Sequence, residues 1–167
     1  MDNIAPSLFG GLCLVQSVSP AIIKKVPISG EWWISIITPD IKMPTKEARE
    51  VLPKNLSTKL WSQQMANTTA LTVAFATGDF ELAKNSLIDL FAEPVRKKLI
   101  PNFDEIKQAA LDNNALGCSI SGGGPSIFAL CKSQKEAQNI LEKMESAAGE
   151  LRCKHFCQVE ARGVTVI

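Results

Sequence analysis

The chain has 167 residues, of which 46% are hydrophobic and 21% charged, and its formal net charge is +1. This much apolar material supports a packed core and excludes a disordered tail, while the near-neutral charge favours neither nucleic acid nor a membrane surface as a partner. No stretch approaches the roughly 18 uninterrupted apolar residues of a membrane-spanning helix, and the first residues lack the pattern of a signal peptide.

The first half of the chain contains two predicted strands and two predicted helices. The apolar run at residues 12–18 and the aromatic and β-branched run at residues 32–37 predict strands. A short helix is predicted at residues 45–52 and a longer one between Ser57 and Gly78, a natural C-cap. One face of the longer helix repeats every three or four residues and comprises Leu60, Trp61, Gln64, Met65, Thr68, Leu71, Thr72 and Phe75.

The second half mixes helices and strands. Helices are predicted to begin at Asp79, Asn102 and Ser133, and strands to cover residues 116–121, 126–131 and 155–161. The first of these helices runs to Phe91, and the last ends at Gly149. Glu105 and Glu136 each stand three residues after a cap residue, the spacing of a capping box. Because the elements do not follow a strict βαβ alternation, the sequence predicts an α+β fold with an antiparallel sheet.

The cysteines are five in number, and most lie within apolar runs, so buried reduced thiols and a cytoplasmic location are predicted. They are Cys13, Cys118, Cys131, Cys153 and Cys157. The last two flank His155, but a zinc site needs four ligands and the sequence offers no second cluster, so no metal site is predicted.

The connection between the two strands at 116–121 and 126–131 is rich in glycine. Residues 119–126 read Ser-Ile-Ser-Gly-Gly-Gly-Pro-Ser. Three glycines let the backbone approach a ligand, and successive amides in such a turn can form a concave anion-binding nest. The pattern is not a Walker loop, since the Gly-Lys-Ser/Thr ending is absent. Read alone, it is more typical of a simple turn.

Arginine is scarce in this chain. Arg49 and Arg96, two of only four arginines, stand beside a helix start and a proline turn. A planar guanidinium can bind a carboxylate or a phosphate through two parallel hydrogen bonds, which a lysine cannot do. The alternative interpretation for each is a solvated surface charge.

Three segments of the chain resemble those of homoserine kinases, a family of the GHMP kinase superfamily. Residues 2–11 resemble the family's DN-x-AP-x-x-x-GG segment, and residues 93–101 resemble its EP-x-R-x-x-LIP element. Residues 116–130, which include the glycines, resemble the third GHMP motif. The third segment indicates the superfamily, and the first two point to homoserine kinase within it.

The resemblance implies a ferredoxin-like GHMP kinase C-terminal domain at residues 31–167, preceded at residues 1–30 by the end of an N-terminal domain that binds ATP. It further implies transfer of the ATP γ-phosphate to L-homoserine in threonine biosynthesis, without a dedicated catalytic base and in a homodimer. His155 is expected to be structural. By the same resemblance the substrate pocket is lined by Asn3, Arg49, Arg96, Ser121, Gly122, Gly123 and Gly124.

The chain departs from the family in what it lacks. The second GHMP motif, a glycine-serine phosphate loop, is absent, as is the segment with the carboxylate associated with Mg²⁺. We therefore expect a piece of a longer enzyme that is inactive alone, with ATP and Mg²⁺ bound mainly by the missing domain. Two alternatives stay open: another GHMP small-molecule kinase, acting on mevalonate or a sugar, and a non-catalytic ligand-binding or dimerisation module of the same fold.

Overall fold

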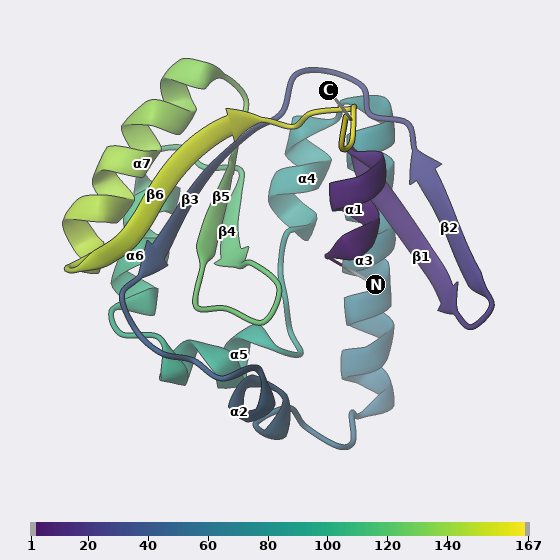
Figure 1. The fold of residues 1–167 in the computed structure, drawn as a ribbon, viewed down its shortest axis with the longest axis horizontal. Helices are drawn as coiled ribbons and strands as arrows, with labels where there is room; N and C mark the ends of the chain where they lie inside the picture. The colour runs from purple at the N-terminus through teal and green to yellow at the C-terminus, as the bar shows by residue number, and fades with distance from the viewer. Residues whose placement is uncertain (1–2, 166–167) are drawn as a thin grey trace.

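A four-stranded antiparallel sheet organises most of the computed structural model, which describes residues 3–165 (Figure 1). Its strands lie in the order β4-β5-β3-β6, and their bounds are β3 Trp33–Pro39, β4 Gly117–Ile120, β5 Ile127–Cys131 and β6 Leu151–Gln158. Helices separate β3 from β4 and β5 from β6, whereas β4 and β5 form a hairpin. This is the split βαβ arrangement of ferredoxin-like domains. The predicted α+β fold with an antiparallel sheet is confirmed.

One face of the sheet packs against α6 (Phe103–Asp112) and α7 (Gln134–Ala148). Side chains alternate between the two faces of a strand, and in β5 this places Ile127, Ala129 and Cys131 in the core beneath these two helices. All three are fully buried. Each buried aliphatic side chain contributes about 1.5–3 kcal/mol to folding, so this layer is the main core of the domain.

The opposite face packs against α3 (Thr58–Thr77) and α4 (Phe80–Ser86). Leu130 of β5 turns to this side, together with Leu116 just before β4. Trp32 closes the layer, with its ring centroid 4.5 Å from that of Phe75 and 4.6 Å from that of Phe80. No described helix is both long and apolar enough to span a bilayer.

The first residues form a separate unit beside α3. Helix α1 (Ile4–Phe9) leads into a two-stranded antiparallel ribbon of β1 (Leu12–Val18) and β2 (Ala21–Val26), which shares no strand with the main sheet. Figure 1 shows the ribbon standing at the outer side of α3. The remaining short elements, α2 (Thr45–Glu50), α5 (Glu93–Arg96) and the 3₁₀ turn η1 (Lys97–Leu99), lie at one end of the sheet, with α2 and α5 side by side.

The segment after β6 returns to α1. Gly11 N donates to Glu160 O at 2.7 Å, and Val164 N donates to Ser7 O at 3.2 Å. At this crossing the two backbones touch, because a Cβ added to Gly163 would lie 1.9 Å from the carbonyl oxygen of Leu8. The segment after β6 is therefore held against the second half of α1, whose upper end in Figure 1 lies beside the C-terminus of the chain.

Several local predictions are confirmed and others are wrong. Ser57, Asp79 and Ser133 cap their helices by accepting from a backbone N–H three residues later. Asn102 precedes α6 as predicted, but its side chain makes no cap hydrogen bond and its backbone is left-handed, with φ 56°. The helix from Asp79 ends at Ser86 rather than Phe91, since the backbone of the following residue leaves the helical region.

One prediction about burial is wrong, and it concerns two of the cysteines. Cys153 and Cys157, on β6, are exposed rather than buried. On the periodic face of α3, Trp61 and Met65 are 56% and 46% exposed. The last strand also begins earlier than predicted, at Leu151.

Candidate functional site

The β4–β5 connection is a tight loop with an open outer side. Ser121 N donates to Ser126 O at 2.8 Å and Gly124 N to Ser121 O at 3.0 Å, which closes the turn. Gly122 and Gly124 have φ of 57° and 85°, a region that favours glycine. The amides of Gly122 and Gly123 donate to no acceptor within residues 3–165. They are two backbone donors that an anionic oxygen can use.

Asn3, at the start of α1, lies over this loop. A Cβ added to Gly122 would stand 3.5 Å from Asn3 Oδ1 and 3.7 Å from Asn3 Nδ2. The Asn3 side chain caps no helix, although it stands at the N-terminus of α1. Asp2, which precedes it in the predicted motif, lies outside the described residues. The amide group of Asn3 therefore lies beside the backbone of Gly122, a residue far away in the sequence.

Arg96, the last residue of α5, joins the loop to α2. Its Nε donates to Ala48 O at 2.8 Å and its Nη1 to Gly122 O at 3.1 Å. Within the described part of the chain, Nη2 has no acceptor and the guanidinium has no acidic partner. Arg96 therefore holds two backbone segments in place and keeps one donor atom and its positive charge available.

Arg49 follows Ala48 in α2, so its backbone lies one residue from the carbonyl that Arg96 binds. Its side chain is exposed and forms no ion pair or side-chain hydrogen bond with any residue from 3 to 165. The structure thus brings Asn3, Arg96 and Gly122 together and places the backbone of Arg49 beside them.

Two carboxylates that carried no role in the sequence predictions organise the approach to Arg96. Asp89 accepts from three successive amides, those of Phe91, Ala92 and Glu93, at 2.8–3.1 Å, and so fixes the turn before α5. Glu93 accepts from Ser119 Oγ at 2.7 Å and forms an ion pair with Lys107. An Asp shortly before a helix start is a recognisable turn signal, whereas nothing in the local sequence predicts the contact of Glu93 with β4.

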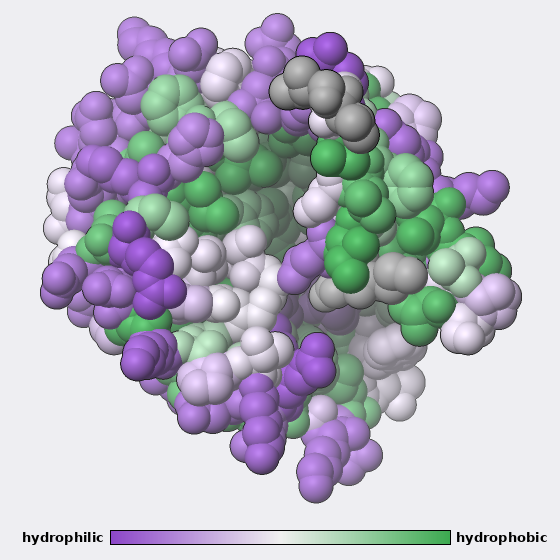
Figure 2. Space-filling view, in the orientation of Figure 1, coloured by the Kyte–Doolittle hydropathy of each residue, from purple (hydrophilic) through white to green (hydrophobic). Residues whose placement is uncertain are grey.

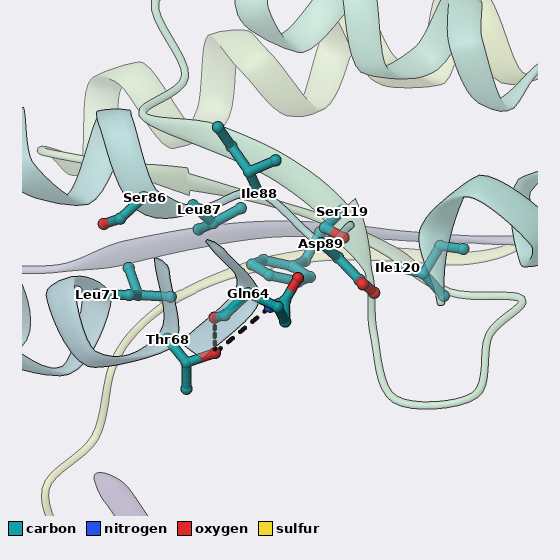
Figure 3. Close-up of a pocket in the computed structure, with 10 residues that line it drawn as sticks. Gln64, Thr68, Leu71, Ser86, Leu87, Ile88, Asp89, Ser119 and Ile120 are labelled. Carbon is teal, nitrogen blue, oxygen red and sulfur yellow. Dashed lines mark hydrogen bonds between the residues drawn. The ribbon is translucent and has the colours of Figure 1, made fainter. Parts of the chain in front are cut away.

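A cavity of about 290 Å³ adjoins the glycine loop, between α3 and the β4–β5 hairpin (Figure 3). Ser119 and Ile120 line it from the strand that leads into the loop, and Gln64 and Thr68 line it from α3. Gln64 Oε1 also accepts from Leu90 N at 2.8 Å, so it ties α3 to the segment before α5. Neither arginine lines this cavity, which makes it a neighbour of the Asn3–Arg96–Gly122 cluster rather than part of it.

Metal and thiol chemistry find little support among these side chains. Residues 3–165 contain no group of three or more His, Cys, Asp or Glu side chains arranged to hold a metal ion. Burial raises the pKa of Cys118, in β4, to about 12 and that of Cys131, in β5, to about 11. Both thiols therefore stay protonated near neutral pH and act as small apolar side chains.

The chain is similar to known proteins over most of its length. Residues 71–151 match the family described as GHMP kinases C terminal. The homoserine kinase of Chlorobium phaeobacteroides (strain BS1) is 40% identical over 153 residues, which is 92% of this chain and 48% of that protein. The crystal structure of homoserine kinase from Cytophaga hutchinsonii ATCC 33406 superposes with a TM-score of 0.89 at 40% identity, over 96% of this chain and 51% of that one.

A more distant neighbour shares the fold alone. The L. major mevalonate kinase structure, in complex with R-mevalonate, matches with a TM-score of 0.72 at 16% identity. The chain spans about half the length of the relatives it matches: it covers 48% and 51% of the two homoserine kinases above. This chain therefore contains a GHMP kinase C-terminal domain and is a homologue of homoserine kinases over most of its length.

Proposed function

We propose that the chain is the substrate-binding part of a homoserine kinase, which transfers the γ-phosphate of ATP to the hydroxyl of L-homoserine and yields O-phosphohomoserine. The observation that carries the proposal is the convergence of Asn3, Arg96 and Gly122 from three distant segments. The 40% identity to homoserine kinases over most of the chain supports the same substrate.

In this proposal each group meets one feature of homoserine. The free donor of Arg96, with Arg49 beside it, binds the substrate carboxylate, for which a guanidinium is well suited. Asn3 and the amides of Ser121, Gly122, Gly123 and Gly124 orient the rest of the molecule and the incoming phosphate oxygens. Phosphoryl transfer depends mainly on such positioning and on charge neutralisation, which is why these residues suffice without a base of their own.

The nucleotide side of the reaction is assigned to the part of the relatives that this chain does not span. Residues 1–30 are proposed to belong with that ATP-binding domain, and residues 31–167 to be the C-terminal domain; the separate β1–β2 ribbon supports a division in this region. The described residues offer no carboxylate cluster that fits Mg²⁺, so no step is assigned to that ion here. A homodimer and a cytoplasmic location stay predictions.

The test is a chimera in which this chain replaces the matching half of the Cytophaga hutchinsonii homoserine kinase. The TM-score of 0.89 supports a compatible junction. We expect homoserine-dependent ADP release from the chimera and none from this chain alone, because phosphoryl transfer needs a bound triphosphate. Turnover by the chain alone would contradict the assignment of ATP binding to the half of the relatives that this chain does not span. A folded chimera whose ADP release does not depend on homoserine would overturn the proposed substrate.

Arg96 gives the sharpest prediction for the substrate site. Arg96→Ala in the chimera should raise KM for homoserine about ten- to a hundred-fold and leave KM for ATP nearly unchanged, since one charge-assisted contact contributes about 1.5–3 kcal/mol. Arg96→Lys should recover only part of the loss. Arg49→Ala is the matched variant, because its exposed side chain forms no hydrogen bond or ion pair with residues 3–165 and its loss should not lower the melting temperature. Unchanged homoserine kinetics in all three variants would remove both arginines from the site.

A further inference from the structure

Glu93 places a largely covered, but not fully buried, carboxylate at the start of α5. Its side chain is 12% exposed, and that of its ion-pair partner Lys107 is 24% exposed. Ser119 Oγ donates to the second carboxylate oxygen at 2.7 Å. A buried charge is costly unless it is both paired and hydrogen-bonded, and Glu93 has both kinds of partner. We name Glu93, Lys107 and Ser119 the Glu93 latch.

Helix α5 is short and depends on polar contacts, one of which is the hydrogen bond from Glu93 N to Asp89 Oδ2. It has four residues, none of them buried, and Ala92 at its N-cap provides no side-chain cap. An isolated turn of helix is unstable in water. Polar contacts at its two ends therefore fix its position: Glu93 at the first residue and Arg96 at the last.

The two contacts attach α5 to one continuous segment. Ser119 lies in β4, and Gly122 lies in the loop that directly follows this strand. Glu93 binds the first and Arg96 binds the second. The side chains of α5 therefore contact both β4 and the loop that follows it, in addition to the hydrogen bond that Asp89 accepts from Glu93 N.

Lys107 gives the latch a second consequence, which is electrostatic. Glu93 and Arg96 are three residues apart on one helix, a spacing at which opposite charges can interact. The Glu93 carboxylate instead pairs with Lys107, and Arg96 forms no ion pair with any residue from 3 to 165. No carboxylate among residues 3–165 therefore neutralises the guanidinium, which can bind an external anion.

We infer that the Glu93 latch positions Arg96 and the glycine loop for the substrate carboxylate, so that Glu93 is a positioning residue of the homoserine site. This inference rests on the proposed function for the identity of the anion. The positioning of Arg96 and the loop by the Glu93 latch concerns this chain alone. Loss of the Glu93 charge releases Lys107 and one end of α5. The position of the loop relative to Arg96 is then no longer fixed. This weakens substrate binding and leaves nucleotide binding unchanged.

The first experiment uses this chain and needs no activity. In amide NMR spectra, Glu93→Gln should shift the resonances of Gly122, Gly123 and Gly124, and Ser119→Ala should shift them in the same direction by less. Asp104→Asn is the matched control, because it removes a carboxylate from an ion pair with Lys97 that is 36% and 68% exposed. Loop resonances that respond no more to Glu93→Gln than to Asp104→Asn would overturn the latch.

The second experiment measures the KM and kcat of the chimera. Glu93→Gln should raise KM for homoserine roughly ten-fold, as a small misplacement of a binding group does, and leave KM for ATP unchanged. The double variant Glu93→Gln/Lys107→Met, which removes both charges, should recover part of the loss. A fall in kcat with unchanged KM for homoserine would overturn the positioning role. A chimera inactive even without substitutions would count against the proposed function, and the NMR result would still decide the latch.

Discussion

Gly123 and Gly124 are adjacent in the loop, yet the structure constrains them differently. A Cβ added to Gly123 meets no atom within 4 Å, and its backbone is outside the left-handed region. Gly124 has φ 85°, and a Cβ there would lie 2.5 Å from Cε of Met43. Limited space and a left-handed backbone therefore require glycine at position 124. At position 123 the protein itself leaves room for a side chain, and only a ligand close to the backbone would require glycine.

This difference makes a prediction that separates binding from folding. Gly124→Ala should destabilise the chain by about 1–3 kcal/mol because a side chain is strained at this φ. Gly123→Val should leave the melting temperature and far-UV circular dichroism of the chain nearly unchanged, yet reduce turnover of the chimera by about two orders of magnitude through loss of close approach. Normal turnover in Gly123→Val would remove this glycine from the substrate site.

At the scale of elements, the sequence was most informative where a signal is local. The caps at Ser57 and Asp79 and the C-cap at Gly78 depend on neighbouring residues only, and the structure has all three. Strand β2 was not predicted, because its exposed residues carry no alternating apolar pattern and it depends on pairing with β1. The approach of Asn3 to the glycine loop followed from a family resemblance, and the contact of Glu93 with Ser119 joins positions that no short motif relates.

The cysteines of the sheet differ in burial, and they should therefore differ in reactivity. Cys118 and Cys131 lie in β4 and β5 with raised pKa values of about 12 and 11, whereas Cys153 is exposed on the edge strand β6. At about pH 8.5, near the ordinary pKa of a thiol, iodoacetamide should modify Cys153 and spare both buried thiols until the chain unfolds. Peptide mass spectrometry measures this; early labelling of Cys118 would show that the core opens.

The same pKa shifts set the sign of a pH effect on stability. Between about pH 9 and pH 11 the unfolded chain releases these thiol protons while the folded chain retains them, so the free energy of unfolding falls as pH rises. Urea titrations across this range should show the fall, and replacing Cys118 and Cys131 by alanine should flatten it. An equal slope in that double variant would assign the effect to other groups.

At the scale of the whole molecule, an apolar surface covers α1 and the ribbon beside a hollow that separates α1 from the sheet (Figure 2). Leu8 of α1 is 50% exposed, and Leu14 and Val18 of β1 are 53% and 63% exposed. A two-stranded ribbon has little stability of its own, and a large exposed apolar patch favours association. We therefore expect this surface to be covered when the chain is at high concentration or joined to the rest of a kinase.

The corresponding prediction concerns the oligomeric state of the isolated chain. Sedimentation velocity should show self-association that increases with concentration, and Leu8→Ser with Val18→Ser should reduce it. The chimera should lose this tendency, because its other half would cover the same surface. A strictly monomeric chain at all concentrations would contradict an adhesive role for α1 and the ribbon.

The contact between α1 and the segment after β6 has a consequence for the order in which the molecule is made. Ribosomes release α1 well before residues 160–164, yet Gly11 and Ser7 find their hydrogen-bond partners in that later segment. Domains fold during synthesis from the N-terminal end, so the sheet can form while α1 is still untethered. The hydrogen bonds that hold α1 therefore form only after translation of residues 160–164, which follow every strand of the main sheet in the sequence.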